Sequence, residues 1–356
     1  MLEEIKIDGC IELENINISD CPKLKKIVVP QSVKTVYIGN CENLEELEAP
    51  YTGSTDKTSL LTLLTVSACP NLKKVTLEGQ NNKTDCEISL IGASGIEDLN
   101  IKGLNVKSII FAPKDTWTSL RSLNMGACFE SNLNYYGSTF GYGDPLDLTT
   151  HPNLRSLSCQ DNQAITSVKC PNIDGHYIEL GTGAFAGCVH LERIYGNFLI
   201  TGSRVFDTCS VLVLNDETTY NSYPLTSYPV PYVPGNKVCN IKISDTLTST
   251  AEMFSNCPEI SGNDFTMIMM LLTDNITNMN KMFLGCRKVD AIIRYDVFRH
   301  CPNVTSLTAF AANSGLKGGI YSRDDNYSES DSTTWGTFDF IRNINSLTEA
   351  FANSGL

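Results

Sequence analysis

Basic residues are scarce in this sequence. Its 356 residues include 27 Lys and Arg against 40 Asp and Glu, which leaves a formal net charge of −13 at pH 7. Proteins that bind nucleic acid draw much of their affinity from clustered Lys and Arg beside phosphates. The composition therefore argues against a nucleic-acid partner and favours a partner with a basic or neutral surface.

Long hydrophobic runs are absent too. No run is long enough to span a bilayer, so we expect no membrane insertion, and no charged-then-apolar signal peptide precedes the first repeat. The sequence starts within a repeat and stops within another at Asn353-Ser354-Gly355-Leu356, without a polar cap. Two explanations stay open: a piece of a larger exported protein, or a subunit whose uncapped ends assemble with neighbours, as in a virion.

The residues of common metal sites lack the required spacing. The four histidines are scattered, and no Cys/His pair has the spacing of a structural zinc site. One acidic stretch offers oxygen ligands without the spaced pattern and terminal Glu of a calcium loop. Its residues are Asp324, Asp325, Asn326, Glu329 and Asp331. We expect no metal site and no cofactor.

Cysteine, by contrast, is plentiful and regularly placed. Most of the 14 cysteines follow spaced aliphatic residues, as in Leu13-x-x-Ile16-x-Ile18-x-x-Cys21. The same frame returns with asparagine in the cysteine slot as Leu154-x-x-Leu157-x-Cys159-x-x-Asn162. This matches the leucine-rich-repeat pattern, whose slot accepts Asn or Cys.

The frame predicts an α/β solenoid: a leucine-rich repeat array with stacked short parallel strands, short helices or turns on the other side, and three irregular inserts. Each unit holds two apolar runs, which indicates two strand-like sides for each coil. In one unit the runs are Leu24/Ile27/Val29 and Val33/Val36/Ile38. After the strand the chain turns inward, where a small buried donor such as Asn or Cys can satisfy a backbone group.

The regular placement of the cysteines also predicts their chemistry. They take one equivalent slot per coil, unlike the irregular spacing of a disulfide scaffold, so we expect them to be buried and reduced. Cys86 and Cys239 lie off this ladder and are the expected exceptions, while His151 replaces a ladder cysteine. A catalytic thiolate needs an electropositive cleft. We therefore expect no enzyme activity.

A second version of the repeat starts near residue 180, with phenylalanine three residues before the cysteine. The pairs are Phe185/Cys188, Phe206/Cys209, Phe254/Cys257, Phe283/Cys286 and Phe298/Cys301. The apolar residues from Asp264 to Asn275 predict a short helix that packs on the solenoid.

These units resemble a known family. Ala184-Phe185-Ala186-Gly187-Cys188-Val189-His190-Leu191, Met253-Phe254-Ser255-Asn256-Cys257 and Met282-Phe283-Leu284-Gly285-Cys286 are similar to BspA-like leucine-rich repeats. The resemblance covers most of the chain outside the inserts. It implies a bacterial surface or secreted adhesion protein without catalytic residues.

Three inserts interrupt the period: 129–150, 215–236 and 318–338. They suggest a first array over 1–214, a Tyr/Pro-rich insert or linker over 215–236, and a second array over 237–356. Tyrosine is concentrated in the inserts and suits binding loops, because it gives broad contact at low entropic cost. The candidate binding residues are Tyr135, Tyr136, Tyr142, Tyr220, Tyr223, Tyr228, Tyr232, Tyr321 and Tyr327. The alternative is that these rings only tie down their own loops.

The sequence thus predicts a non-catalytic binding or adhesion scaffold that presents a solenoid face and Tyr-rich loops to a protein or glycan partner. The expected location is extracellular or at the cell surface. The competing interpretation is a structural subunit of a larger assembly, such as a phage virion or tail appendage.

Overall fold

The computed structural model describes residues 2–49, 60–79, 85–111, 118–127, 133–135, 138–140, 145–214, 239–293, 297–318 and 344–354. The chain forms two units, Met1–Ile178 and Glu179–Leu356, which we call unit 1 and unit 2. The predicted linker at 215–236 lies outside the described residues, so the division into two arrays at that insert stays a prediction.

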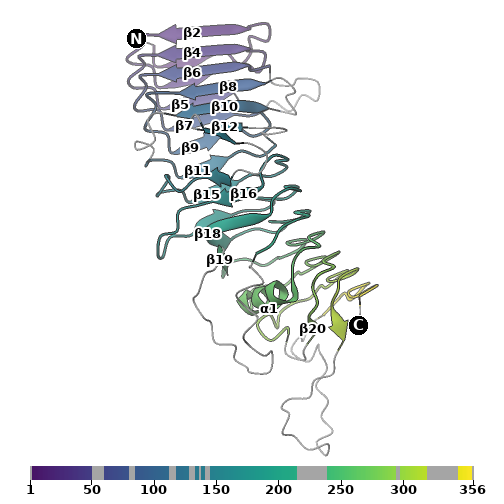
Figure 1. The fold of residues 1–356 in the computed structure, drawn as a ribbon. Coiled ribbons are helices and arrows are strands. Elements are labelled where there is room, and N and C mark those ends of the chain that lie inside the picture. The colour runs from purple at the N-terminus through teal and green to yellow at the C-terminus, as the bar shows by residue number, and fades with distance from the viewer. Residues whose placement is uncertain are drawn as a thin grey trace, which may run out of the picture. The chain divides into compact units, whose positions relative to one another are not determined.

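Each coil of unit 1 contributes one strand to each of two sheets, and neighbouring coils pair these strands in parallel. The first sheet, which we call the charged sheet, contains β1 (Glu4–Lys6), β3 (Lys26–Val28), β5 (Glu46–Ala49), β7 (Lys74–Leu77), β9 (Asp98–Asn100), β11 (Ser122–Asn124) and β15 (Ser156–Ser158). The second, the neutral sheet, contains β2 (Asn15–Ser19), β4 (Thr35–Gly39), β6 (Leu63–Ser67), β8 (Cys86–Leu90), β10 (Val106–Phe111) and β12 (Leu133–Tyr135). Figure 1 shows β2, β4 and β6 stacked in order.

Three more strands complete unit 1, and a fourth reaches its boundary. β13 (Ser138–Phe140) pairs antiparallel with β12 and ends the neutral sheet, and β14 (Pro145–Asp147) pairs in parallel with β16 (Ser167–Lys169). β17 (Ile178–Leu180) lies where unit 1 ends and unit 2 begins.

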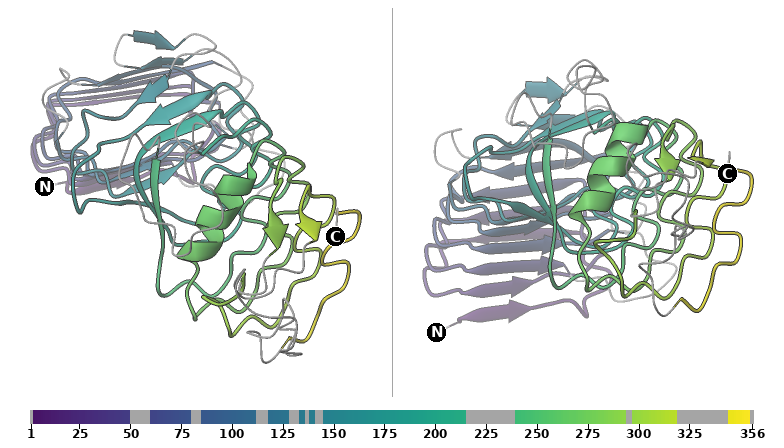
Figure 2. Two further views of the ribbon diagram at one scale, coloured as in Figure 1. Left: turned by 60° about the horizontal axis from the view of Figure 1, so that its bottom comes forward. Right: turned by 90° about the horizontal axis from the view of Figure 1, so that it is seen from below.

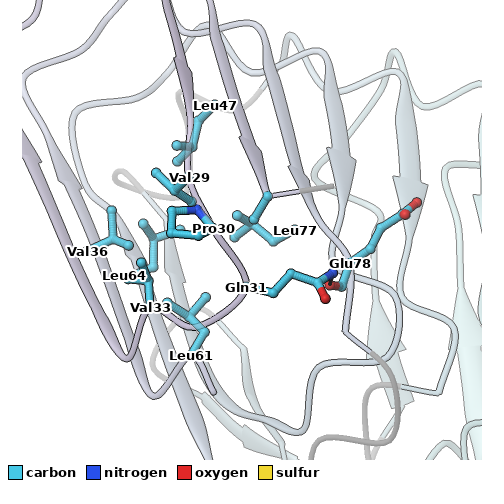
Figure 3. A pocket seen from close by; sticks show the side chains of 11 residues that line it. Val29, Pro30, Gln31, Val33, Val36, Leu47, Leu61, Leu64, Leu77 and Glu78 are labelled. Carbon is cyan, nitrogen blue, oxygen red and sulfur yellow. Dashed lines mark hydrogen bonds between the residues drawn. The ribbon is translucent and has the colours of Figure 1, made fainter. Parts of the chain in front are cut away.

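The core of unit 1 lies between its two sheets. Alternate residues of each strand point inward, so Val36 and Leu64 of the neutral sheet face the same interior space as Leu47 and Leu77 of the charged sheet (Figure 3). All four side chains are buried. The gap that they leave is about 10 Å³, which is no more than a single water needs, so this space is packed core and not a ligand site.

Unit 2 has less regular strand structure. β18 (Arg193–Ile200) pairs in parallel with β19 (Cys239–Ile243), and β20 (Ile292–Ile293) pairs with β21 (Lys317–Gly318). Single parallel bridges join successive coils from Ser249 to Asn278, Ser306 and Ser346. Its coils are therefore held by turns and isolated bridges more than by long strands.

The phenylalanine of each coil stacks on that of the next within unit 2. The rings of Phe185 and Phe206 are stacked with centroids 5.8 Å apart, and Phe206 continues to Phe254 at 5.4 Å. Phe254 stacks on Phe283 at 5.7 Å, and Phe283 meets Phe310 edge-on at 5.6 Å. Such pairs contribute about 0.5–1.5 kcal/mol each beyond their burial. The phenylalanine positions found in the sequence therefore form one continuous aromatic core.

The α-helix of the described residues is α1 (Gly262–Leu271), close to the helix predicted from Asp264 to Asn275. Ser261 caps it: its hydroxyl accepts from the Asp264 N–H at 3.2 Å, and the Asp264 carboxylate accepts from the Ser261 N–H at 3.0 Å. Phe265 packs edge-on against Phe283 at 4.9 Å, and both views of Figure 2 show α1 beside the coils of unit 2.

The predicted solenoid of stacked parallel strands is confirmed, as are the two strand-like sides of each coil in unit 1. Because the described residues form one helix and three sheets, the α/β label is only approximate. None of the described helical residues form a span that is long and apolar enough to cross a membrane.

Candidate functional site

The tyrosine candidates fall almost entirely outside the part of the chain that the structure describes. Tyr135 lies in β12, where the backbone alone is described. The other eight, Tyr136, Tyr142, Tyr220, Tyr223, Tyr228, Tyr232, Tyr321 and Tyr327, lie in undescribed segments. Their role in binding stays a prediction.

The ladder cysteines act as hydrogen-bond donors inside the solenoid. In unit 2 three thiols donate to the phenylalanine carbonyl of a preceding coil, at 2.9–3.1 Å. The pairs are Cys209 to Phe185, Cys257 to Phe206 and Cys286 to Phe254. The expected role of the slot, a small donor for an inward-facing backbone group, is confirmed at these positions.

Burial makes these thiols poor nucleophiles. It raises the pKa of Cys69 to about 11 and those of Cys286 and Cys301 to about 12, because a buried thiolate would lose its hydration. Burial also raises the pKa of Cys257 well above its ordinary value. Since the thiolate is the reactive form, these cysteines are inert at neutral pH.

Two cysteine predictions are corrected by the structure. Cys86, expected as an exception to the ladder, is fully buried in β8, where its side chain alternates inward with Ile88. Cys10, expected to be buried, is exposed, and Cys21 is half-buried. The structure describes no coil that covers the outer side of this first turn. The side chain of Cys239, the other expected exception, is not described.

Asn162 and His151 take the same slot as cysteine. The Asn162 amide is fully buried and donates to the Met125 carbonyl at 2.7 Å and to the Cys159 carbonyl at 3.0 Å. His151 is also fully buried, and its carbonyl accepts from the Leu154 N–H at 3.0 Å, as the ladder cysteines do in other coils. The exchange of Cys, Asn and His in this slot therefore preserves one turn geometry.

Sequence reasoning missed the asparagine two residues beyond many ladder positions. The Asn71 amide donates to the Glu42 carbonyl at 2.8 Å, and Asn303 donates to the Asp274 carbonyl at 2.7 Å, in each case reaching the preceding coil. The recurring Cys-Pro-Asn unit in the sequence could have revealed this asparagine. Asn303 also begins an Asn-x-Thr pattern, the acceptor sequence for N-glycosylation, but its side-chain amide already holds two coils together.

The outward face of the charged sheet neutralises itself. The register places Glu4, Lys26, Glu46, Lys74 and Asp98 side by side on successive strands, so that the sign alternates from coil to coil. Lys26 lies 2.7 Å from the Glu46 carboxylate. Opposite charges on adjacent strands stabilise this register and leave few charges for a ligand.

Glu48 is the centre of this charge ladder. Its carboxylate accepts from Lys26 at 2.9 Å and from Lys74 at 3.0 Å. These hydrogen bonds, first from Lys26 and then from Lys74, lower the pKa of Glu48. The hydrogen bonds that Lys26 donates to Glu46 and Glu48 raise the pKa of Lys26.

The outward face of the neutral sheet is different. One row across it reads Asn17, Tyr37, Thr65, Ser89 and Ile110, in register on five strands and without a charge. Tyr37 is 42% exposed and Ile110 is 39% exposed.

The neighbouring row, Asn15, Thr35, Leu63, Glu87 and Ser108, holds one charged residue. A Cβ at Gly39 would lie 3.1 Å from the Tyr37 Cε1 atom, so glycine makes room for the tyrosine ring along the sheet. Interface cores are poor in charge, and this face shares that property with them.

Unit 2 carries a second candidate, a polar trough of about 800 Å³. It follows a corner of successive coils that lies two residues beyond the core phenylalanine, or three residues beyond it in the coil of Phe310. The corner residues are Thr208, Asn256, Gly285, Asn313 and Asn353, all with positive φ. The sequence did not reveal this trough, because its members are separated by unequal lengths of chain.

The described residues hold no group of three or more His, Cys, Asp or Glu that could bind a metal ion. His176 is buried and contacts the Arg155 guanidinium at 2.7 Å and the Leu154 carbonyl at 2.6 Å. An imidazole held between these two groups has a structural role.

Comparison with known proteins places the chain beside bacterial leucine-rich repeat proteins. No family model matches it, and neither does any curated protein. A leucine-rich cell surface protein from Faecalibacterium prausnitzii is similar over 91% of this chain and 86% of its own, at 13% identity and a TM-score of 0.29.

Two leucine-rich repeat proteins are similar in the same way. The one from Eubacterium ventriosum shares 10% identity over 89% of this chain and 92% of its own, with a TM-score of 0.29. The one from Bacteroides ovatus shares 14% identity over 87% and 84%, with a TM-score of 0.21. At such TM-scores the fold assignment depends on the chain's own strand pairing.

Proposed function

We propose that this chain is a non-catalytic binding scaffold that presents the neutral sheet of unit 1, together with its Tyr-rich inserts, to a protein or glycan partner. The observation that carries the proposal is the contrast between the two sheets. One face pairs its charges among its own residues, while the other presents Tyr37, Leu63 and Ile110 among hydroxyl and amide side chains.

The chemistry of the described residues supports a role without catalysis. Ladder thiols have pKa values raised by burial, and the polar residues of the coil slots are used in holding coils together. A surface location and adhesion are part of the proposal, in keeping with the printed description of the Faecalibacterium protein as a cell surface protein. No observation on the described residues favours a virion subunit.

A matched pair of lysine substitutions tests this proposal. Thr65 on the neutral sheet and Thr76 on the charged sheet are both half-buried threonines at the centre of outward strand faces. Thr65→Lys places an unpaired charge on the proposed contact surface, where a partner would have to desolvate it. Thr76→Lys adds the same charge beside an existing charge ladder.

The measurement is binding of the labelled whole chain to immobilised mucin and extracellular-matrix proteins, with thermal unfolding as the fold control. We expect Thr65→Lys to weaken binding at least tenfold and Thr76→Lys to leave it within twofold. Equal effects of the two substitutions, or no binding by the unsubstituted chain to any of these surfaces, would exclude the neutral sheet as the contact face.

A further inference from the structure

At the corners that line the polar trough of unit 2, most backbone N–H groups already donate hydrogen bonds within the protein. The N–H groups of four of the five corner residues donate to a carbonyl of the following coil: Thr208 to Ser255 at 2.7 Å, Asn256 to Leu284 at 2.7 Å, Gly285 to Ala312 at 2.8 Å and Asn313 to Ala352 at 2.7 Å. Peptides commonly bind by pairing their backbone with free N–H and C=O groups of a strand edge. Here the corner N–H groups are already used, so a ligand must be held by side chains.

The side chains that line the trough suit a hydroxyl-rich ligand. Thr208, Ser210, Asn256 and Asn313 carry hydroxyl or amide groups, which both donate and accept hydrogen bonds. The hydroxyls of a saccharide do the same, whereas a peptide side chain seldom offers both at every position. Pro258 supplies an apolar surface against which the C–H face of a sugar ring can lie.

Among the described residues that line the trough, Arg287 is the single charged one. It is exposed and makes no ion pair with any residue that the structure describes, whereas its neighbour Lys288 pairs with Glu259. A guanidinium presents a planar fork of donors that matches a carboxylate in bidentate geometry. A cation without a carboxylate partner in a trough of hydroxyls and amides selects for an acidic ligand.

The corner spacing also favours a linear ligand. Successive coils lie roughly 4.8 Å apart where their backbones are hydrogen-bonded. The Asn353 amide donates to the Asn313 side-chain oxygen at 3.1 Å, so the corner amides of these two neighbouring coils form a polar pair. A chain of sugar rings laid along the corners would meet a hydroxyl or amide side chain at every coil except that of Gly285.

We propose that this trough binds an acidic saccharide, a glycan chain bearing carboxylates, with Arg287 pairing to a carboxylate and the corner amides contacting hydroxyls. This site lies in unit 2 and does not depend on the neutral sheet of unit 1. It assigns the trough a ligand class that the repeat fold alone does not.

The corner geometry provides a substitution that removes an amide without straining the backbone. Asn256 and Asn313 have φ values of 55° and 56°, a region that glycine adopts freely, and Gly285 already occupies the equivalent corner of the coil between them. Asn256→Gly, Asn313→Gly and Arg287→Gln therefore remove trough chemistry while the fold is kept. Asn40→Gly is the matched control, because Asn40 has a φ of 53° in unit 1 and is not a trough residue.

The experiment is titration of the whole chain with six-residue uronate and sialylated oligosaccharides, their methyl-esterified counterparts and a hexaglutamate peptide. We expect at least one acidic saccharide to bind, its ester to bind about tenfold more weakly, and Arg287→Gln to abolish that difference. Asn256→Gly and Asn313→Gly should each weaken binding about threefold to tenfold, with Asn40→Gly unchanged.

Three results would overturn the proposal. Binding of hexaglutamate but of no saccharide would identify an acidic-peptide site. Equal binding of a saccharide and its ester would remove the role of Arg287. Failure of every acidic saccharide to bind a chain with unchanged thermal unfolding would leave the trough without the proposed ligand.

Discussion

Single residues of the coil slot stabilise this fold by giving hydrogen bonds to backbone carbonyls that water does not reach. Cys257 and Asn162 do this with different groups: one thiol hydrogen bond for the cysteine, two amide hydrogen bonds for the asparagine. A buried carbonyl that loses its donor costs about 1–3 kcal/mol. For stability, a hydrogen bond from this slot therefore matters more than which residue supplies it.

Substitutions at Asn162 test this at the residue scale. Asn162→Ala removes both amide hydrogen bonds and leaves a small cavity, so we expect the free energy of unfolding to fall by about 2–4 kcal/mol. Asn162→Cys restores the commonest residue of the slot and one donor, so its loss should be about half as large. Urea unfolding followed by circular dichroism measures both. An equal loss for the two variants would contradict the donor role.

The strands themselves were largely predictable, because burial of alternate residues places apolar side chains at every second position of the sequence. Val36 and Ile38 of β4, or Leu64 and Val66 of β6, are buried where the frame expects them. The charge ladder could also have been predicted: Glu46, with Lys26 and Lys74 at the equivalent positions of the neighbouring coils, lies directly before the core residue Leu47 of its strand. Aligning the coils would have exposed the alternation.

Other features could not be predicted from the repeat frame. The trough depends on which side chains line the corners of coils of unequal length, so no regular spacing marks Asn256 or Arg287 as neighbours. The burial of Cys86 follows from its place in β8, whose strand lacks the usual frame before it. The inserts contain no period at all, and their tyrosines stay predictions.

The charge ladder predicts a pH dependence at the scale of the sheet. The pKa of Glu48 is lowered in the folded chain, so its ion pairs stabilise the fold fully above the ordinary pKa of glutamate, about 4.3, and this contribution is lost as the pH falls through the lowered value. Glu48→Gln should therefore cost about 1 kcal/mol at pH 7, as expected for partly exposed pairs.

The cost of the same substitution should shrink as the pH falls below the ordinary pKa of glutamate, and it should disappear once Glu48 of the unsubstituted chain is protonated, because the ion pairs are then lost in both chains. Urea unfolding at several pH values measures the difference. Glu42→Gln is the control, because Glu42 is exposed and forms no ion pair with the described residues. A cost of Glu48→Gln that does not change with pH would show that the carboxylate acts by packing and not by charge.

At the scale of the whole molecule, stability is spread over contacts between neighbouring coils. A repeat array gains its core by stacking, so each coil depends on its neighbours for burial of its apolar residues. In unit 2 the aromatic core from Phe185 to Phe283 and the thiol hydrogen bonds run along the same coils. The account as a whole therefore requires that the regularly placed thiols be interior groups.

Alkylation of the native chain with iodoacetamide, read residue by residue by mass spectrometry, tests that requirement most directly. We predict rapid labelling of Cys10 and Cys21, and labelling of the ten buried cysteines of the described residues only after unfolding in urea. Labelling of Cys69, Cys209 or Cys257 in the native chain as fast as in urea would contradict the account.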